Sequence, residues 1–322
     1  MENSNNPFLQ HSGVQHPLIC GPMYPCSNPE LVAAASAAGA LGVIQPIATS
    51  YVHGYELSKG IEYIRSMTDK PLAMNLLIEK SSRRYHEKMQ TWLDIALEHD
   101  IRFFITSLGK PQWVVERVHA CQGYVYHDVT EAKWADKAID CGVDGLIAVN
   151  NRAGGHAGAK NARDLYQALD SFNYPLVCAG GIADAGQYRD MLELGYHAVQ
   201  MGTRFIASKE CSASNQYKNA IVNANEKDIV LSERITGVPV SIINTPLVQK
   251  KGLKANFIEH YMLNHPKMKH LIRTFLALRS LKTLKNSLQS SQIEYWQAGK
   301  SVASVDAIMS VNEIVKDITE KA

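Results

Sequence analysis

The clearest indication of a ligand-binding site in this sequence is a pair of predicted strands that each end in a glycine turn. Residues 175–210 predict an apolar strand ending in Gly180-Gly181, a helix, and a second apolar strand ending in Gly202-Thr203. Glycine lets the backbone approach a ligand closely, and N–H groups at the start of a helix carry partial positive charge. The two turns together could therefore hold one phosphate group. The alternative is that these glycines only form tight turns between strands and helices.

A titratable side chain lies in another glycine-rich segment, the loop of residues 150–158 with the sequence NNRAGGHAG. Its His156 follows the sixth predicted strand, and an imidazole can take or hold a proton near neutral pH. Arg152 in the same loop could add a fixed positive charge at the rim of a pocket, or it could lie at the surface. His156 could equally be an exposed polar residue in a loop that the glycines shape.

The other predicted strand ends argue against two kinds of chemistry. None places a lysine directly after a strand, which disfavours a Schiff-base aldolase. No three potential ligands have the spacing of a metal site, so we expect no catalytic metal. The residues that follow the eight predicted strands are Gly21-Pro22-Met23, Gln45-Pro46, Asn75, Thr106-Ser107, His127-Asp128, Asn150-Asn151, Gly180-Gly181 and Gly202-Thr203.

The elements that would position these residues alternate between short apolar strands and amphipathic helices, which implies a parallel sheet with helices outside. Eight such units predict a closed (β/α)8 TIM barrel of the α/β class, in which ligands sit at the carboxyl ends of the strands. An open doubly wound sheet is the alternative, but it seldom has eight such regular units. The predicted strands are Leu18–Cys20, Leu41–Ile44, Leu72–Ile78, Arg102–Ile105, Tyr124–Tyr126, Gly145–Val149, Leu176–Ala179 and Ala198–Met201.

The helices are predicted from apolar periodicity and from their boundary residues. We expect helices over about Pro29–Ala38, Tyr55–Met67, Arg83–His99 and Ala183–Leu194, one with Pro111 at its start, and one capped imperfectly by Thr130.

Beyond the eighth strand the pattern changes. We expect a helix over Ala207–Ala224, a loop over Ile235–Val240 and a last barrel helix over Val302–Ile318. Residues 260–293 contain no acidic residue but several basic ones, with apolar residues at helical spacing. This segment could pack on the barrel with a solvated basic face, form a lid, contact an acidic carrier or a nicotinamide phosphate, or lie on a membrane surface. The basic residues are Lys267, Lys269, Arg273, Arg279, Lys282 and Lys285, and the apolar ones are Leu271, Phe275, Leu278, Leu281, Leu284 and Leu288.

Composition limits the classes of partner. Lys and Arg number 33 against 31 Asp and Glu in 322 residues, and a net charge of +2 gives no general electrostatic case for nucleic acid. The six cysteines are dispersed without a CxxC pair, which fits a reducing cytoplasm. The first residues lack the basic start and apolar core of a secretion signal. Residues 31–50, the longest uncharged stretch, are interrupted by glycine and proline, so we expect no integral membrane segment.

Three segments together resemble the nitronate monooxygenase (2-nitropropane dioxygenase-like) family. They are RAGGHAG at residues 152–158, AGGIAD at residues 179–184 and QMGTRF at residues 200–205. The resemblance covers essentially the whole chain, and its AGGH-x-G motif is specific to this group, which is related to the flavin-dependent enoyl-ACP reductases. It implies an FMN-dependent barrel in which a helical segment after the eighth strand closes over the active site.

The resemblance also implies roles for individual residues. His156 matches the catalytic histidine of the family, and Asn75 matches its FMN-binding asparagine. Gly154 and Gly155 would pass close to the flavin. Many members carry a glutamate where this chain has Arg152, which leaves the substrate open. The remaining FMN-binding positions are Gly21, Pro22 and Met23 beside the isoalloxazine ring, and Gly180, Gly181, Gln200, Met201, Gly202 and Thr203 at the phosphate and ribityl chain.

Three functions follow as alternatives. The first is an FMN enzyme that oxidises alkyl nitronates or nitroalkanes with O2 to carbonyl compounds and nitrite. The second is an FMN reductase that uses NADH or NADPH to reduce a quinone or an enoyl thioester. The third is a flavin-free lyase or isomerase acting on a phosphorylated metabolite. We expect a barrel over residues 1–211, a helical lid over 212–294 and a returning C-terminal helix over 295–322, in a cytoplasmic protein that could form a homodimer.

Overall fold

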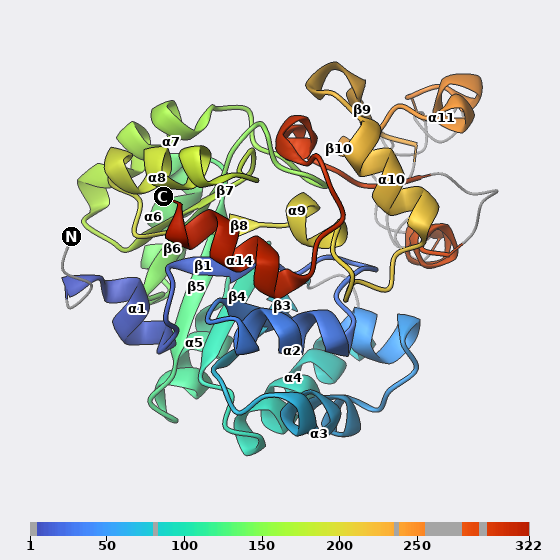
Figure 1. The fold of residues 1–322 in the computed structure, drawn as a ribbon. Coiled ribbons are helices and arrows are strands. Elements are labelled where there is room, and N and C mark those ends of the chain that lie inside the picture. The colour runs from blue at the N-terminus through green and yellow to red at the C-terminus, as the bar shows by residue number, and fades with distance from the viewer. Residues whose placement is uncertain (1–4, 80–82, 235–237, 255–278, 290–294, 322) are drawn as a thin grey trace, which may run out of the picture.

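Eight parallel strands close into a barrel, as the sequence predicts (Figure 1). The computed structural model describes residues 5–79, 83–234, 238–254, 279–289 and 295–321. Each strand pairs with the next along the chain, and the first pairs with the eighth, with Cys20 opposite Met201. The strands are β1 (Leu18–Cys20), β2 (Leu41–Ile44), β3 (Leu72–Leu77), β4 (Phe103–Ser107), β5 (Tyr124–Val129), β6 (Gly145–Val149), β7 (Leu176–Ala179) and β8 (Ala198–Met201).

Two strands extend further toward the carboxyl end than predicted. β4 ends at Ser107, which pairs with Leu77, and β5 includes Asp128, which pairs with Ile147. Polar residues that the sequence places after these strands therefore lie within them. Pairing with neighbouring strands decides this, because β propensity depends on context more than on residue type.

Helices surround the barrel and mostly follow the predicted boundaries. Glu131, and not Thr130, occupies the N-cap position of the helix after β5, without a side-chain capping bond. The helix after β7 starts two residues late because Asp184 caps it by accepting the N–H of Gln187. The helices are α1 (Pro7–Ser12), α2 (Pro29–Ala37), α3 (Leu57–Met67), α4 (Arg83–Glu98), α5 (Gln112–His119), α6 (Ala132–Ile139), α7 (Ala162–Leu169), α8 (Ala185–Leu194), α9 (Thr203–Ile206), α10 (Asn215–Asn223), α11 (Pro246–Lys251) and α14 (Val311–Glu320).

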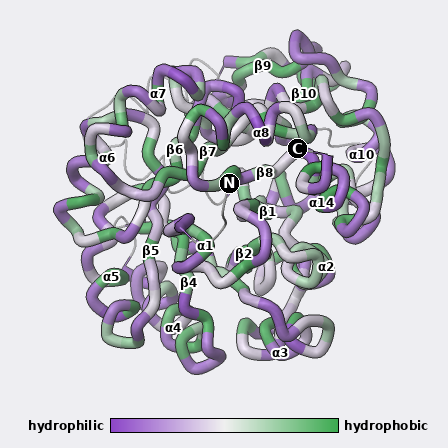
Figure 2. The backbone as a smooth tube through the Cα atoms, turned by 60° about the vertical axis from the view of Figure 1, so that its left-hand side comes forward, coloured by the Kyte–Doolittle hydropathy of each residue, from purple (hydrophilic) through white to green (hydrophobic). Residues whose placement is uncertain are grey.

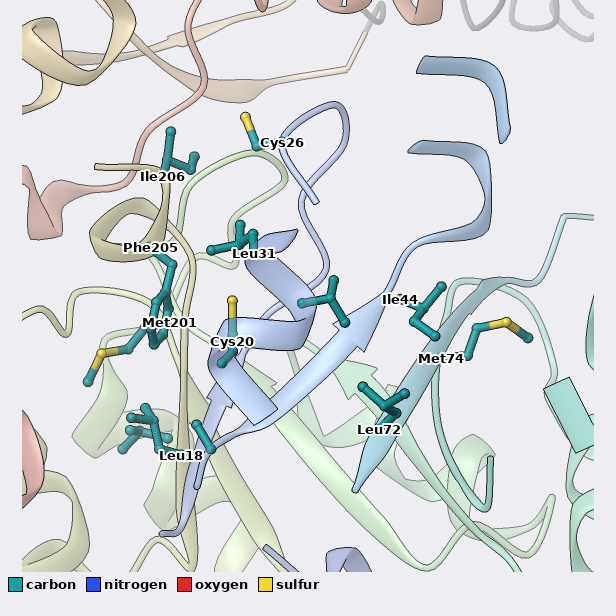
Figure 3. Close-up of a cluster of buried hydrophobic side chains, with 14 of the residues drawn as sticks. Leu18, Cys20, Cys26, Leu31, Ile44, Leu72, Met74, Met201, Phe205 and Ile206 are labelled. Carbon is teal, nitrogen blue, oxygen red and sulfur yellow. The ribbon is translucent and has the colours of Figure 1, made fainter. Parts of the chain in front are cut away.

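Alternate strand residues form two separate apolar layers. The outer layer packs between the strands and the helices, and Figure 3 shows part of it, with Leu18, Cys20 and Met201 in the same cluster as Leu31 of α2. The inner layer fills the barrel, so the barrel is a packed core and not a pore. Its strand residues are Ile19, Leu41, Val43, Ala73, Phe103, Ile105, Tyr126, Ile147, Val177, Ala179 and Ala198.

Helix α1, which the sequence patterns above do not predict, covers the amino-terminal end of the barrel. Asn6 caps it by accepting hydrogen bonds from the N–H groups of Phe8 and Leu9, and Gly13 ends it in the left-handed conformation. Phe8 is fully buried and packs edge-on against Phe103. Figure 2 accordingly shows α1 within the ring of strands, so the opposite end of the barrel is left as the open one.

The chain after β8 departs from the predicted pattern. α9 and α10 are separated by the irregular residues 207–214, so the single helix predicted over Ala207–Ala224 is wrong. Asn28 explains the interruption, because its side chain bonds the carbonyl of Glu210 at 2.9 Å and the N–H of Ser212 at 2.9 Å. These side-chain bonds replace the helical pairing of that backbone.

A two-stranded antiparallel sheet follows, which is not among the predicted elements. It pairs β9 (Ile229–Ser232) with β10 (Val240–Ile243), two short segments rich in β-branched residues. Val240 therefore begins a strand and does not belong to the predicted loop, of which residues 235–237 lie outside the described residues.

The last barrel helix starts later than predicted. α14 begins at Val311 because Ser310 and Glu313 form a capping box, so the predicted start at Val302 is wrong. Before it, η5 (Lys300–Ser304) is a short 3-10 helix. α14 packs against α2 and α8 and so completes the outer ring (Figure 1).

Much of the predicted basic helix lies outside the described residues. Residues 279–287 are helical, and Leu284 and Leu288 are buried. The lid over residues 212–294 is therefore described only in part and stays a prediction. Among the described residues, we find no helix with the length and apolar character that crossing a membrane requires. The predicted positions outside the described residues are Lys267, Lys269, Leu271, Arg273, Phe275 and Leu278.

Candidate active site at the carboxyl end of the barrel

A polar layer covers the apolar interior at the carboxyl end of the barrel. Side chains alternate along a strand, so the position two residues beyond an inward apolar residue also points inward. By this rule Asn75, Ser107, Asp128 and Gln200 lie one step above Ala73, Ile105, Tyr126 and Ala198 of the interior. Asn75 is buried and its Nδ2 donates to the carbonyl of Ile105 at 3.1 Å. The open end of the barrel thus has a polar floor, where barrel enzymes bind their ligands.

Asp128 lies on this polar floor and is not among the predicted catalytic or cofactor-binding residues. Ser107 Oγ donates to Asp128 Oδ2 at 2.5 Å, which is a short bond of the kind that a carboxylate accepts. Burial nevertheless raises the pKa of Asp128 to about 6, against the lowering effect of Ser107. Its second oxygen, Oδ1, is buried without a hydrogen-bond partner among the described residues. Only the period-two pattern extended past Tyr126 could have indicated an inward carboxyl here.

His127, the neighbour of Asp128, faces the opposite way. It lies between Val125 and Val129 of the outer layer and is buried. Its Nδ1 is 2.8 Å from Thr106 Oγ1, and burial lowers its pKa to about 4. His127 is therefore a neutral histidine of the core and not a group of the barrel mouth.

The turn after β1 and the turn after β8 lie against each other. A Cβ placed on Gly21 would come 2.9 Å from Cγ of Gln200, and one placed on Gly202 would come 3.4 Å from Sδ of Met23. Gln200 Oε1 is buried without a partner among the described residues, so its amide end is available to a ligand. The Met201 side chain points into the outer layer (Figure 3), which leaves its backbone as the part nearest the mouth.

Backbone conformation and packing alone require glycine at the two positions after β7, whether or not a ligand binds there. Gly180 has φ +112° and Gly181 has φ +81°, in the region that favours glycine. A Cβ on Gly180 would lie 2.6 Å from the backbone nitrogen of Ala153, and one on Gly181 would lie 2.6 Å from Nε of Arg152. The turn therefore fits closely against the loop of residues 150–158.

Unpaired backbone N–H groups gather at the predicted phosphate corner. Across the described residues, no protein acceptor pairs with the N–H groups of Gly181, Ile182, Gly202 or Thr203. Thr203 Oγ1 is occupied, because it accepts the N–H of Gly299 at 2.9 Å. Such N–H groups on two adjacent turns are the donors that an anion needs.

The glycine-rich loop of residues 150–158 is fixed by contacts on several sides. Asn150 Nδ2 donates to the carbonyl of Gly180 at 2.8 Å, and the carbonyl of Gly155 accepts the N–H of Ser241 in β10 at 2.7 Å. Gly154 lies against the C-terminal segment, since a Cβ there would come 2.9 Å from the nitrogen of Gly299. The loop is therefore held between β7, the β9–β10 sheet and the C-terminal segment.

His156 occupies the outer part of this loop. Its side chain is exposed, yet the surrounding protein desolvates it enough to lower its pKa below the ordinary value. The imidazole is therefore neutral at pH 7 and can accept a proton. No hydrogen bond to another described residue engages its ring, so both ring nitrogens are available to a ligand.

Arg152 forms a bidentate ion pair with Glu226. Its Nη1 and Nη2 lie 2.8 and 3.0 Å from the two carboxylate oxygens, and its side chain is 34% exposed. Arg152 therefore connects the loop to the segment after α10, which answers the question that the sequence left open about its position. Glu226 balances the positive charge of Arg152, so Arg152 does not present an unbalanced charge at the open end of the barrel.

The groups of the mouth suit a ligand that carries both a phosphate and a polar ring edge. The four unpaired N–H groups would take the phosphate, and the unpartnered oxygens of Asp128 and Gln200 would meet polar atoms of the ring. Within the described ranges, no three His, Cys, Asp or Glu side chains are grouped as a metal site would need.

Comparison with known proteins gives matches over most of the chain. The profile of the family described as nitronate monooxygenase matches residues 5–321. A probable nitronate monooxygenase of Staphylococcus saprophyticus is 29% identical, and the match covers 95% of this chain and 96% of that protein. The structure of FabK from Thermotoga maritima has a TM-score of 0.80 at 26% identity, covering 99% of this chain and 96% of FabK.

A third relative carries a different name. The (3aS,4S,5R,7aS)-5-hydroxy-7a-methyl-1-oxo-octahydro-1H-indene-4-carboxyl-CoA dehydrogenase of Rhodococcus jostii is 28% identical to this chain. The match covers 77% of this chain and 66% of that protein. Proteins similar to this chain thus include both probable nitronate monooxygenases and a dehydrogenase of a CoA thioester.

Proposed function

The chain belongs to the nitronate monooxygenase family, and we propose that it uses FMN to oxidise alkyl nitronates or nitroalkanes with O2 to carbonyl compounds and nitrite. Membership confirms the resemblance that the AGGH-x-G motif indicates, and it makes the protein an oxidoreductase. It also sets aside the flavin-free lyase or isomerase, which is another class of enzyme. A cytoplasmic location and a homodimer stay predictions.

The position of His156 is the observation that carries this proposal. A loop held between β7, the β9–β10 sheet and the C-terminal segment presents a neutral imidazole at the open end of the barrel. The polar floor lies at the same end of the barrel. A ligand bound in the mouth would therefore have a proton acceptor beside it and hydrogen-bonding groups beneath it.

The cofactor would be held mainly by backbone groups and amides. The N–H groups of Gly181, Ile182, Gly202 and Thr203 would bind the phosphate of FMN. Asn75 and Gln200 would supply polar contacts on the floor of the mouth. When bound, FMN would supply the electron transfer between the substrate and O2.

His156 would handle the proton of the substrate. A neutral nitroalkane must lose its α-proton before it can be oxidised, and a neutral imidazole accepts a proton at pH 7. A preformed nitronate has already lost that proton, so the same imidazole would only donate a hydrogen bond to the anion. Arg152 is paired with Glu226 and contributes no unmatched charge to this step.

Contacts from residues 279–289 support a lid over the mouth as part of the proposal. Tyr24, in the loop after β1, donates its hydroxyl to the carbonyl of Leu281 at 2.6 Å. Lys285 Nζ donates to the carbonyl of Tyr51 at 2.6 Å and lies 4.5 Å from the centre of its ring. The segment thus contacts the loop after β1 and η2 (Ala48–Val52), a short π-helix after β2, and both belong to the carboxyl end of the barrel. The subdomain of residues 212–294 would exclude water from the site.

The second candidate is a reductase that takes electrons from NADH or NADPH and reduces a quinone or an enoyl thioester. The observation that favours it is the Rhodococcus jostii relative, whose name states that it acts on a carboxyl-CoA. The same cofactor site would serve both reactions. The two reactions differ in their electron donor and their electron acceptor.

One preparation tests the proposal. The protein should purify yellow, heat denaturation should release FMN and not FAD, and steady-state assays should show nitrite formation with propionate-3-nitronate and with nitroalkanes. Release of FAD, or a colourless protein that gains no flavin on reconstitution, would contradict the cofactor. Stoichiometric loss of nicotinamide absorbance on adding a quinone or an enoyl thioester, without nitrite formation from nitronates, would establish the second candidate.

A further inference from the structure

We propose that Asp128, oriented by Ser107, is a proton-exchanging residue of the cofactor site, which takes up one proton when a bound flavin accepts two electrons. The inference rests on the proposed function, because it needs a redox cofactor in the barrel mouth. It assigns a task to the carboxyl group of the polar floor, which the proton chemistry of His156 does not use.

The geometry of the carboxyl group carries the argument. One oxygen, Oδ2, is held by Ser107 Oγ at 2.5 Å, which fixes the orientation of the group. The other oxygen, Oδ1, is fully buried and has no partner among the described residues. An unpaired buried oxygen is unfavourable. A ligand atom that faces Oδ1 and shares a hydrogen bond with it would remove this penalty.

The surroundings place Oδ1 toward a ligand and away from the core. Tyr126, two residues earlier in β5, points into the barrel interior, so Asp128 points into the mouth above it. On the neighbouring strands, Ser107 of β4 bonds Asp128 and Ile147 of β6 pairs with it, and neither of these side chains titrates. His127 is the titratable residue next to Asp128 in sequence, and His156 is the titratable residue in the loop after the neighbouring strand β6. Only desolvation shifts the pKa of each, so no charged neighbour already neutralises Asp128.

The pKa of Asp128 lies close enough to neutral pH for this coupling. Burial already raises its pKa to about 6, so only about one further unit separates it from neutrality. Electrons added to a cofactor above it place negative charge near the carboxylate. A like charge raises the pKa of a carboxyl group further. Asp128 is therefore ionised at pH 7 beside an oxidised cofactor and protonated beside a reduced one.

The step balances in charge and atoms. The oxidised flavin and the Asp128 carboxylate together accept two electrons and two protons. One proton goes to the flavin and the other to the carboxylate, which gives a singly negative reduced flavin and a neutral Asp128. The electrons come from the nitronate or from a nicotinamide donor, and the protons come from solvent.

Potentiometry on the flavin-loaded protein tests the coupling. In a two-electron reaction each proton taken up changes the midpoint potential by about 30 mV per tenfold change in proton activity, which is one pH unit. Between about pH 6 and the higher pKa that Asp128 has beside the reduced flavin, the native protein should therefore show a slope of about 60 mV per pH unit. Asp128→Asn should show about 30 mV. Asp136→Asn, which removes an exposed carboxylate on α6, is the matched control and should keep the native slope.

Two further measurements use protein that keeps Asp128. Ser107→Ala removes the hydrogen bond that lowers the pKa of Asp128, so the pH at which the slope changes should rise. Infrared difference spectra of the native protein should gain a protonated carboxyl band on reduction by dithionite. That band should be absent from Asp128→Asn wherever this variant folds.

The possible failures are distinguishable. Equal slopes in native protein and Asp128→Asn, both loaded with flavin, overturn the coupling and leave the proposed function intact. Absence of a carboxyl band from the native protein on reduction does the same. A native protein that binds no flavin at all overturns the proposed function, and the coupling falls with it.

Discussion

At the scale of single residues, the mouth of this barrel separates neighbouring side chains into different environments. His127 and Asp128 are adjacent in sequence, yet His127 is neutral in the outer core, and Asp128 faces the open end with an oxygen that no described residue pairs. Burial acts on both, but in opposite directions on the pKa, because it always disfavours the charged form. The period of two along β5 therefore decides which residue takes part in chemistry.

His156→Ala tests whether the imidazole acts as a base. The variant should keep its flavin, because the phosphate corner consists of backbone N–H groups that the substitution does not touch. Turnover of a neutral nitroalkane should fall by ~10²–10⁴, the usual contribution of a positioned acid or base. Turnover of a preformed nitronate should fall much less, because that substrate needs no deprotonation.

The measurement is steady-state nitrite formation with both substrates, next to the flavin content of each preparation. Small and equal losses on the two substrates would leave His156 as a positioning residue only. Undiminished rates on both would return it to an exposed loop residue without a role.

At the scale of elements, the sequence predicted the strands far better than the chain beyond them. Five predicted strands, including Leu41–Ile44 and Gly145–Val149, match the structure at both ends, because each is a short apolar run bounded by turn residues. Helix α1 was missed although Asn6, Pro7 and Gly13 are recognisable boundary signals. It is short, and its apolar face has meaning only once the barrel exists to receive it.

The site was predictable in part for the same reason. Glycine turns such as Gly180-Gly181 are visible in sequence, but the fit of Gly181 against Arg152 is a contact between distant segments. The pairing of Arg152 with Glu226 joins residues 74 apart and has no local signal. The break between α9 and α10 has its cause in Asn28, near the other end of the chain. Local patterns predict elements, whereas long-range hydrogen bonds decide where they stop.

The connection between the histidine loop and the segment after α10 can be tested by Glu226→Gln. The ion pair with Arg152 is partly exposed, so its loss should reduce the free energy of unfolding by about 1 kcal/mol or less, with a melting shift of about 4 °C or less. Turnover should fall severalfold, because the loop that carries His156 loses one attachment. Glu131→Gln is the control, since Glu131 makes a similarly exposed pair with Lys133 on α6.

Thermal unfolding and nitrite formation on the two variants give the comparison. A loss of turnover in Glu226→Gln with none in Glu131→Gln supports the attachment of the loop. Equal turnover in both variants would show that the ion pair does not help to position the loop.

At the scale of the whole molecule, buried and half-buried histidines should make the fold sensitive to mild acid. Burial lowers the pKa of His11, His16 and His197, which lie toward the amino-terminal end of the barrel, and lowers that of His127 to about 4. The unfolded chain binds protons on these residues below about pH 6.5, whereas the folded chain binds them only at lower pH. Stability due to these groups is therefore full above pH 6.5 and is lost progressively as the pH falls toward 4.

Asp128 opposes this trend. Its pKa is raised to about 6 from an unfolded value near 4, so the folded chain binds its proton first and gains stability as the pH falls from 7 to 5. Linkage gives a gain of about 1 kcal/mol from Asp128 and a loss of about 2 kcal/mol from His127 over that range. The other histidines whose pKa burial lowers add to the loss, so the balance is a net destabilisation; they are His11, His16, His53, His156 and His197.

Two variants separate these contributions in equilibrium urea unfolding at pH 7 and pH 5. Asp128→Asn removes the opposing group, so its free energy of unfolding should fall by about 1 kcal/mol more than that of the native protein between the two pH values. His127→Asn keeps a polar atom near Thr106 Oγ1 but cannot gain a proton, so its loss should be smaller by about 2 kcal/mol. Removing ring atoms lowers the absolute stability of His127→Asn, so only the change with pH is compared. If all three proteins lose equal stability, neither group has the shifted pKa that its burial implies.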